Sequence, residues 1–446
     1  MEYAKYLELV ARHRPEMAAA ERYIWEHPET GFREWQTSAY LADIFEKAGY
    51  TLVKAGDIPG FYADIDTGRP GPKLLILCEL DALLAPGHFQ AREGRAHACG
   101  HHAQCAAMVG IALALKEPGA LDGLSGSIRL MAVPAEEGIE LDFRRDLRRQ
   151  GLIHSPTGKE EFLYRGYMDG VDLAYMFHTG PSDGPKFACN RGSNGLVMKT
   201  ARYAGTAAHA GGAPHMGRNA LYAATLGLQG INDLRETFQD DEHIRIHPII
   251  TAGGESVNII PANVQIDTFV RGASMESVMR ANEKVNRALA AGALAMGATV
   301  KVSDMLGYAP LNNSAELMAV AKDCMETLLG AEEVQIDDGW GCGSTDMGNL
   351  SCVMPCMHPH IGGAVGKSHG DDYAIGDFDT ACVVSAQGQV VLAAELLCNG
   401  AQKARRVVES YKPLYAGREA YFRAVDALCA DRELIAYEGA SARVQF

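Results

Sequence analysis

Three apolar, strand-like runs in this chain each lead into acidic or metal-binding side chains. Residues 73–80 precede Asp81, residues 127–133 precede the pair Glu136 and Glu137, and residues 171–177 precede His178. Ligands of open α/β sheets bind at the carboxyl ends of the strands. We therefore expect these side chains to meet in one crevice of an α/β domain.

The segment between the first two runs adds a thiol and an imidazole at close spacing. Cys99 and His101 are two residues apart, just before a helix rich in Ala, Met, Val and Leu. Thiolate, imidazole and carboxylate groups bind divalent metals at neutral pH. With Glu137, His178 and a late His369 they could supply five ligand atoms, and Cys99 is the natural candidate to bridge two ions about 3.5 to 4 Å apart.

The consecutive carboxylates Glu136 and Glu137 indicate two different roles. Neighbouring residues in an extended loop point to opposite sides. One carboxylate can therefore bind metal while the other takes a proton from water and delivers it to a leaving nitrogen. A lone Cys is usually a core residue, and a Glu-Glu pair is usually a surface feature. Their joint placement at strand ends favours a functional site.

Charge and composition limit the classes of partner. The formal net charge of -15 disfavours a nucleic-acid partner, which requires clustered Lys and Arg. We see no signal peptide and no apolar run that predicts a membrane span. Eleven cysteines, several of them in apolar elements, are typical of reduced core residues, so we expect a cytoplasmic protein.

The order of helices and strands predicts an α/β protein in which one domain is inserted into another. Residues 1–188 and 305–446 are expected to form a catalytic domain with a central mixed sheet flanked by helices, including helices at 16–27, 36–48, 315–329 and 385–398. Residues 189–304 follow a β-α-β-β-α-β order, typical of a ferredoxin-like α+β domain. The expected elements of this insert are strands 195–203, 244–251, 264–270 and 299–303 and helices 217–235 and 275–296.

Seven short motifs, spread in order over nearly the whole chain, carry a family resemblance. They are Glu26-His27-Pro28-Glu29-Thr30-Gly31-Phe32, Glu79-Leu80-Asp81-Ala82-Leu83, Ala98-Cys99-Gly100-His101, Pro134-Ala135-Glu136-Glu137-Gly138, Gly205-Thr206-Ala207-Ala208-His209-Ala210, Gly217-Arg218-Asn219-Ala220-Leu221 and Val257-Asn258-Ile259-Ile260-Pro261. The chain resembles the two-domain metallo-amidohydrolases that include aminoacylases, hippurate hydrolase, auxin-conjugate hydrolases and aminobenzoyl-glutamate hydrolases. Residues 205–221 and the pair Arg271-Gly272 look closest to the last group.

The resemblance implies a metal-dependent hydrolase of the amide bond in a small N-acyl or N-aroyl amino acid. It implies two divalent ions, Mn²⁺ or Zn²⁺, with a set of five ligands: Cys99, His101, Glu137, His178 and His369. Glu136 would then be the general base and acid, and Asp81 would orient a ligand.

The same resemblance implies that the insert is a lid and dimerisation domain. His209 would reach the scissile carbonyl, and Asn258 and Arg271 would hold the substrate carboxylate. The residues around His209 are small Gly and Ala, which disfavours a packed core histidine. In relatives of this kind the histidine completes the partner's site, so we expect a homodimer.

The chain departs from the family pattern at two places. Relatives usually carry Asp and His where this chain has His102 and Gln104, and the Pro that often follows the Asp-Ala-Leu motif is Leu84 here. A longer loop, residues 85–96, follows Leu84. These changes are expected to alter polarity beside the metals and the shape of the substrate pocket.

Other functions use the same residues. A dipeptidase or carboxypeptidase needs the same site, and a catalytically silent metal- or ligand-binding homologue would keep the scaffold. The additional carboxylate of Glu136 disfavours the silent protein, because binding alone needs no base. Thiol catalysis by Cys99 with a neighbouring His is a third hypothesis, but it leaves the carboxylate pair and His178 without a role.

Overall fold

The computed structural model describes residues 3–439 and 441–446, and the chain divides into two compact units. Unit 1 comprises Met1–Gly192, Asn312–Gly339 and Asn349–Arg418, and unit 2 comprises Ser193–Leu311, Trp340–Gly348 and Glu419–Phe446. The sequence analysis places all of residues 305–446 in the larger domain. In the structure the C-terminal segment belongs instead with the insert, because β22 (Ala430–Glu433) pairs antiparallel with β15 (Thr299–Tyr308).

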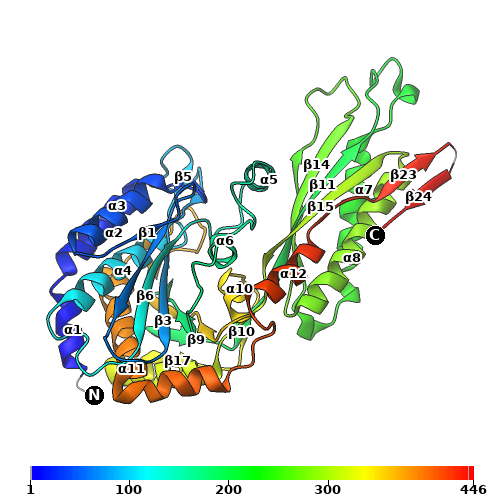
Figure 1. Ribbon diagram of the computed structural model, residues 1–446. Helices are drawn as coiled ribbons and strands as arrows, with labels where there is room; N and C mark the ends of the chain where they lie inside the picture. Colours follow the sequence, from blue (N-terminus) through cyan, green and yellow to red (C-terminus); the bar gives the residue numbers. More distant parts are fainter. Residues whose placement is uncertain (1–2, 440) are drawn as a thin grey trace. The chain divides into compact units, whose positions relative to one another are not determined.

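Unit 1 is built around a mixed six-stranded sheet in the order β1-β2-β6-β3-β7-β19. Figure 1 labels three of its strands, β1, β6 and β3. The strands are β1 (Val53–Lys54), β2 (Phe61–Asp66), β6 (Ser127–Val133), β3 (Lys73–Glu79), β7 (Leu173–Tyr175) and β19 (Cys356–Met357). The central β6, β3, β7 and β19 run parallel, whereas β1 and β2 are antiparallel to their neighbours. All but the first residue of β3 and of β6 are buried, which explains why both read as continuous apolar runs.

Helices and a second, smaller sheet complete unit 1. The helices are α1 (Ala4–Ala11), α2 (Arg14–Glu26), α3 (Trp35–Lys47), α4 (His101–Lys116), α5 (Leu141–Arg149), α6 (Gly158–Tyr164), α9 (Ala315–Leu329) and α11 (Ser385–Ser410). The smaller sheet contains β17 (Val334–Ile336), β9 (Phe187–Cys189), β20 (His360–Val365), β21 (Ala374–Ile375) and β8 (His178–Pro181). Helix α4 packs against β3 and against α2 and α11, so that one continuous core surrounds it.

One helical stretch of unit 1, Asp379–Ser410, is long and apolar enough to cross a bilayer by length and composition. In the structure 78% of its apolar segment is buried inside the protein, as expected for a core helix. Residues Cys398–Ala401 leave helical geometry, which explains why the sequence pattern predicts an end at Cys398. The helix resumes beyond this break and reaches Ser410.

Unit 2 has the expected ferredoxin-like insert as its core. Its sheet has the order β12-β14-β11-β15-β22, with β13 also paired to β14. The elements are β11 (Gly195–Ala204), α7 (Ala220–Asp233), β12 (Arg245–Ile246), β13 (Ile249–Ala252), β14 (Asn263–Gly272), α8 (Met275–Ala295) and β15. Alternating residues of β14 are buried, and α7 and α8 pack against the sheet and each other. Together with the mixed sheet of unit 1, this topology confirms the expected fold class.

Candidate metal centre

Cys99 and His101 are brought together by a tight turn at the start of α4. Gly100 between them has a φ of 91°, which favours glycine. A Cβ at this position would lie 2.4 Å from the hydroxyl of Tyr373 and 2.7 Å from that of Thr179. The glycine therefore both permits the turn and leaves room for the neighbouring side chains.

The five predicted ligands converge in unit 1 as two groups that share Cys99. In each group the candidate ligand atoms lie within 4.8 Å of one another. One group contains Cys99, His101 and His178, and the other contains Cys99, Glu137 and His369. The sulfur of Cys99 lies 3.5 Å from His178 Nε2 and 3.4 Å from His369 Nε2. Cys99 is therefore placed where a ligand shared between two ions would have to lie.

The hydrogen bonds of two histidines favour the tautomer that a metal ligand needs. Nδ1 of His178 lies 2.9 Å from the carbonyl oxygen of Thr179, and Nδ1 of His101 lies 2.9 Å from that of Asp81. A carbonyl only accepts, so each Nδ1 must be the donor. The Nε2 of each neutral ring then keeps its lone pair available for a cation.

The two carboxylates that follow β6 face different neighbours. Oε1 of Glu137 is 3.4 Å from His369 Nε2, whereas Glu136 groups with Glu79 and His101. Ala135, just before them, has a φ of 56°, in the left-handed region. Asp81 accepts the backbone N–H of Glu137 at 2.8 Å and also lies 3.2 Å from His101 Nδ1. Asp81 therefore links the carboxylate loop to His101.

Electrostatics inside the cluster keep its sulfur and carboxylate anionic. Burial and Glu137 oppose ionisation of the Cys99 thiol, but His178 and His101 outweigh them and lower its pKa to about 6. Hydrogen bonds to Cys99 and Glu137 raise the pKa of His369 to about 11. In the metal-free cluster, protons on imidazoles thus balance the anions. Divalent cations could replace those protons, because metal binding to such ligands releases them.

Buried polar atoms without hydrogen-bond partners are a second indication that the cluster can hold a metal. His101 Nε2 and Glu137 Oε1 are buried and have no hydrogen-bond partner among the described residues, although each lies close to an opposite charge. Buried polar atoms without partners are costly unless another ligand satisfies them. The donor set of one thiolate, three imidazoles and a carboxylate suits Zn²⁺ or Mn²⁺.

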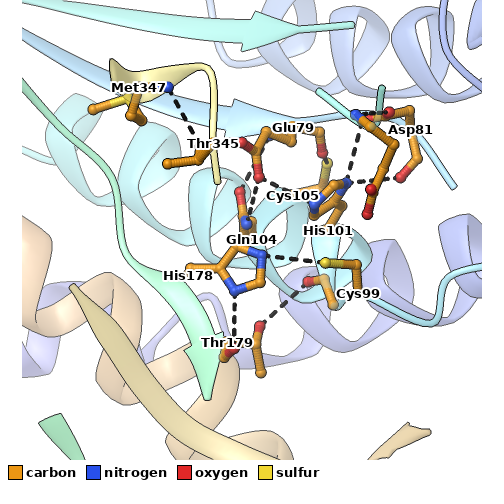
Figure 2. A network of polar contacts seen from close by, with 12 residues as sticks. Glu79, Asp81, Cys99, His101, Gln104, Cys105, His178, Thr179, Thr345 and Met347 are labelled. Atoms are coloured by element: carbon orange, nitrogen blue, oxygen red, sulfur yellow. Dashed lines mark hydrogen bonds and ion pairs between the residues drawn. The ribbon is translucent and has the colours of Figure 1, made fainter. Parts of the chain in front are cut away.

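Two buried side chains beside the cluster, Glu79 and Lys159, escaped the sequence analysis. Glu79 lies 3.2 Å from His101 Nε2 through one carboxylate oxygen, which also accepts from Gln104 at 2.8 Å (Figure 2). Its other oxygen accepts from the ammonium of Lys159. Glu79 was detectable, because it precedes Asp81 by two residues and so shares its side of the strand. Lys159 gave no signal, since its burial depends on how α6 packs.

The two departures from the family pattern have distinct surroundings. Gln104 donates to the buried Glu79, which itself groups with His101 and Glu136. His102 instead faces helix α2, with Nε2 3.4 Å from Glu21 and its ring 4.7 Å from that of Trp25. Neither replaces a member of the ligand cluster.

The insert residues His209 and Asn258 lie close together in unit 2. Both belong to exposed loops, and the N–H of Ala210 donates to the carbonyl of Asn258 at 2.9 Å. Nδ1 of His209 accepts the backbone N–H groups of Gly211 and Gly212 at 3.1 and 2.9 Å. An accepting Nδ1 carries no proton, so the donor of the His209 ring is Nε2.

Arg271 lies at the other end of β14 from Asn258. It is the ninth of the ten residues of the strand, whereas Asn258 precedes the first residue, Asn263. Its Nη1 donates to Ser344 at 3.3 Å. A strand rises about 3.3 Å per residue, so the eight steps from Asn263 to Arg271 span about 26 Å. One copy of unit 2 therefore does not bring Asn258 and Arg271 to the same small carboxylate.

Known proteins match the chain over most of its length. The profile of peptidase family M20/M25/M40 matches residues 60–386. One of the two p-aminobenzoyl-glutamate hydrolase subunits of Escherichia coli (strain K12) is 31% identical over 290 residues, which are 62% of this chain and 55% of that protein. Xaa-Arg dipeptidase of Homo sapiens is 29% identical over 370 residues, which are 78% and 77% of the two chains. The chain thus spans about half the length of the first relative and about three quarters of the second.

Solved structures share the fold. An aminobenzoyl-glutamate utilization protein from Klebsiella pneumoniae superimposes with a TM-score of 0.64 at 22% identity, covering 88% of this chain and 98% of that one. A dinuclear metal-binding peptidase of the M20 family from Bacillus subtilis gives a TM-score of 0.64 at 20% identity, covering 87% and 99%. At these identities the likeness establishes the architecture alone.

Proposed function

Because the chain belongs to peptidase family M20/M25/M40, whose members are metal-dependent amide hydrolases, we propose that it hydrolyses an N-acyl or N-aroyl amino acid. The products are a carboxylic acid and an amino acid. A substrate resembling p-aminobenzoyl-glutamate is favoured, since two relatives are subunits of the hydrolase named for that compound, at 31% and 30% identity.

The observation that carries this proposal is the shared position of Cys99. Its sulfur belongs to both groups of candidate ligand atoms, in unit 1 alone. Two ions held by the five residues, Mn²⁺ or Zn²⁺, would polarise the amide carbonyl and activate water. Glu136, which groups with Glu79 and His101, would take a proton from the attacking water and deliver it to the leaving nitrogen. Asp81 holds the Glu137 backbone and faces His101, which supports an orienting role.

The insert would stabilise the charge that develops on the carbonyl oxygen. His209 lies on an exposed loop, and its Nε2 is a donor because Nδ1 accepts two backbone N–H groups. A fixed, neutral donor of this kind suits an oxyanion. Arg271 offers a planar pair of donors that matches a substrate carboxylate.

A homodimer would resolve the separation between Asn258 and Arg271. We propose that His209 acts in the partner's site and that Asn258 and Arg271 are supplied to one substrate by different copies of the chain. The surface of unit 2 supports this assembly: no further strand pairs with β13 within residues 3–439 and 441–446, and its Ile249 and Ile250 are exposed. On α7, Tyr222 and Leu226 are also exposed. An unpaired strand edge with apolar side chains favours pairing with a second copy.

A cytoplasmic location remains part of the proposal. The eleven cysteines are free in the structure, with no disulfide among them. Free, mostly buried thiols are typical of a reducing compartment.

A dipeptidase is the second candidate. It is favoured by the match to Xaa-Arg dipeptidase, which extends over more of both chains than the match to the hydrolase subunit at 31% identity. A dipeptide presents the same amide and the same free carboxylate, so specificity would lie in the acyl pocket.

Purified protein should be freed of metal with a chelator, reloaded with Mn²⁺ or Zn²⁺, and tested on p-aminobenzoyl-glutamate, hippurate, N-acyl amino acids and Xaa-Arg dipeptides. We expect hydrolysis only after reloading, and Glu136→Ala serves as the matched inactive variant. Turnover that survives complete metal removal would favour thiol catalysis by Cys99. No hydrolysis of any compound by the reloaded protein would overturn the proposed substrate class.

A further inference from the structure

The segment between Glu137 and α6 buries one arginine completely. Helix α5 lies in this segment, and its Arg144 is 1% exposed, although Arg145, Arg148 and Arg149 on the same helix are partly or largely exposed. Burial of a guanidinium is costly unless its donors are paired. The groups that accept hydrogen bonds from Arg144 therefore indicate why it is buried.

The guanidinium of Arg144 donates to four backbone carbonyls. Nε bonds the carbonyl of Ile139 at 2.7 Å, Nη2 bonds that of Glu137, and Nη1 bonds those of Pro156 and, at 3.4 Å, Ala135. The carbonyls of Ala135 and Glu137 stand on either side of Glu136. One side chain thus fixes the peptide that precedes Glu136, the proposed general base, and the peptide that follows Glu137.

Carboxylates fix the same loop through its N–H groups. Ala135 donates to Glu34 at 2.7 Å, and Glu137 donates to Asp81 at 2.8 Å. Ala135 is also held at a φ of 56°, a conformation that L residues adopt only when their surroundings impose it. The loop therefore depends for its shape on the carboxyl groups of Glu34 and Asp81 and on the cation of Arg144.

The surroundings of Arg144 are shaped for a guanidinium. A Cβ at Gly31 would lie 2.5 Å from Nη2, so a glycine leaves the space that the fork occupies. Gly158, at the start of α6, donates its N–H to the Ala135 carbonyl at 3.2 Å, and a Cβ there would lie 1.6 Å from the carbonyl oxygen of Pro134. The chain thus leaves room for the guanidinium at Gly31 and closes tightly on the carboxylate loop at Gly158.

We propose that Arg144 is a positioning residue that holds Glu136 and Glu137 in their working geometry. It acts through the backbone of the loop and does not touch the reacting atoms. Its catalytic consequence rests on the proposed function, because it requires that Glu136 moves protons and Glu137 binds metal. Only the branched, planar guanidinium reaches carbonyls in several directions, so lysine is a poor replacement.

The test compares Arg144→Lys and Arg144→Ala with Arg148→Ala, which removes a more exposed arginine one turn along the same helix. In Arg144→Lys we expect kcat to fall by about 10²-fold with little change in KM, because small displacements of a catalytic group cost that much. The Mn²⁺ affinity should fall as well, and the amides of Ala135 and Glu137 should exchange hydrogen faster. Millimolar guanidinium, far below denaturing concentration, should restore part of the kcat of Arg144→Ala.

The Arg148→Ala variant should match the wild type in kcat, KM, Mn²⁺ affinity and amide exchange. A purely structural Arg144 would lower the melting temperature but leave kcat unchanged while the protein is folded, and that result would overturn the proposal. Unaltered amide exchange in Arg144→Lys would also overturn the proposal. If Arg144→Ala does not fold, the measurements on Arg144→Lys decide the test. If the wild type hydrolyses no amide, the proposed function fails, while amide exchange and Mn²⁺ affinity still decide the role of Arg144.

Discussion

The two units hold their candidate functional side chains in opposite ways. In unit 1, His101 and Glu137 are buried, and the backbone and Asp81 fix their orientation. In unit 2, His209 and Asn258 lie on exposed loops, and their side chains bond neighbouring loop residues. The difference indicates that folding alone assembles the metal ligands of unit 1. The exposed His209 and Asn258 of unit 2 can contact a substrate or another copy of the chain.

The largest loss of metal and activity is expected from a change in the buried ligand cluster of unit 1. Cys99→Ala removes the sulfur shared by both ligand groups, so most of the bound metal and essentially all activity should be lost. Elemental analysis of the purified variant measures the loss, and Cys342→Ala in unit 2 is the matched control. Metal content equal to that of the wild type would contradict the bridging role.

The carboxylate pair should separate metal binding from proton transfer. Glu136→Ala should keep its metal and lose a factor of about 10² to 10⁴ in kcat, the usual contribution of a general base. Glu137→Ala should lose metal, because its carboxylate faces His369 and Cys99. Metal content and kcat of both variants decide the assignment. Metal loss in Glu136→Ala together with a benign Glu137→Ala would reverse the two roles.

A smaller effect is expected from Arg271 in unit 2. Arg271→Lys should lower kcat/KM for acids by about tenfold, roughly the value of one charged hydrogen bond, since lysine cannot offer the planar fork. Matched amide or ester analogues, which lack the carboxylate, should lose much less. If both substrate types lose equally, Arg271 has a structural role, such as its contact with Ser344.

The smallest perturbation is a change of pH, with the alkylation rate of Cys99 in the wild-type protein as the measurement. Because the pKa of Cys99 is lowered to about 6, the metal-free protein should hold a thiol below that pH and a reactive thiolate above it. The rate of Cys99 alkylation should therefore rise with a midpoint near 6, well below the ordinary range for cysteine. Subtracting the rate of a Cys99→Ser variant isolates this residue. A midpoint at the ordinary value would mean that His178 and His101 do not stabilise the thiolate.

Local pattern predicts well where local forces decide structure. The strand at 127–133 and the helix at 315–329 have the expected bounds, because a strand buried on both faces reads as a short apolar run and an amphipathic helix carries a strong periodic signal. The pattern at 244–251 predicts one strand, but the structure has two short ones, β12 and β13, which keep one register against β14 up to a shift between Ile250 and Ala252. The strand expected at 171–177 is only Leu173–Tyr175, so His178 begins β8 instead of closing β7.

The candidate metal ligands were predictable from the sequence, but the residues that hold them in position were not. Strand-end position brought out Glu137 and His178, and close spacing to His101 brought out Cys99; the fold then gathers these side chains. The roles of Arg144 and Lys159 depend on a non-local path of the chain, and an arginine on a charged helix reads as a surface residue. The separation of Asn258 from Arg271 likewise emerges only when the register of β14 is known.

Subunit mixing tests the central claim most directly, namely that unit 1 supplies metals and base while unit 2 supplies His209 to a partner. His209→Ala alone should keep metal and lose about 10² to 10³ in kcat, the effect of removing one oxyanion donor. Glu136→Ala alone should also be inactive. Mixed in equal amounts with verified subunit exchange, the two variants should regain about a quarter of wild-type activity, since half the dimers are mixed and each has one intact site. No recovery would contradict the account, because His209 would then act within its own chain or not at all.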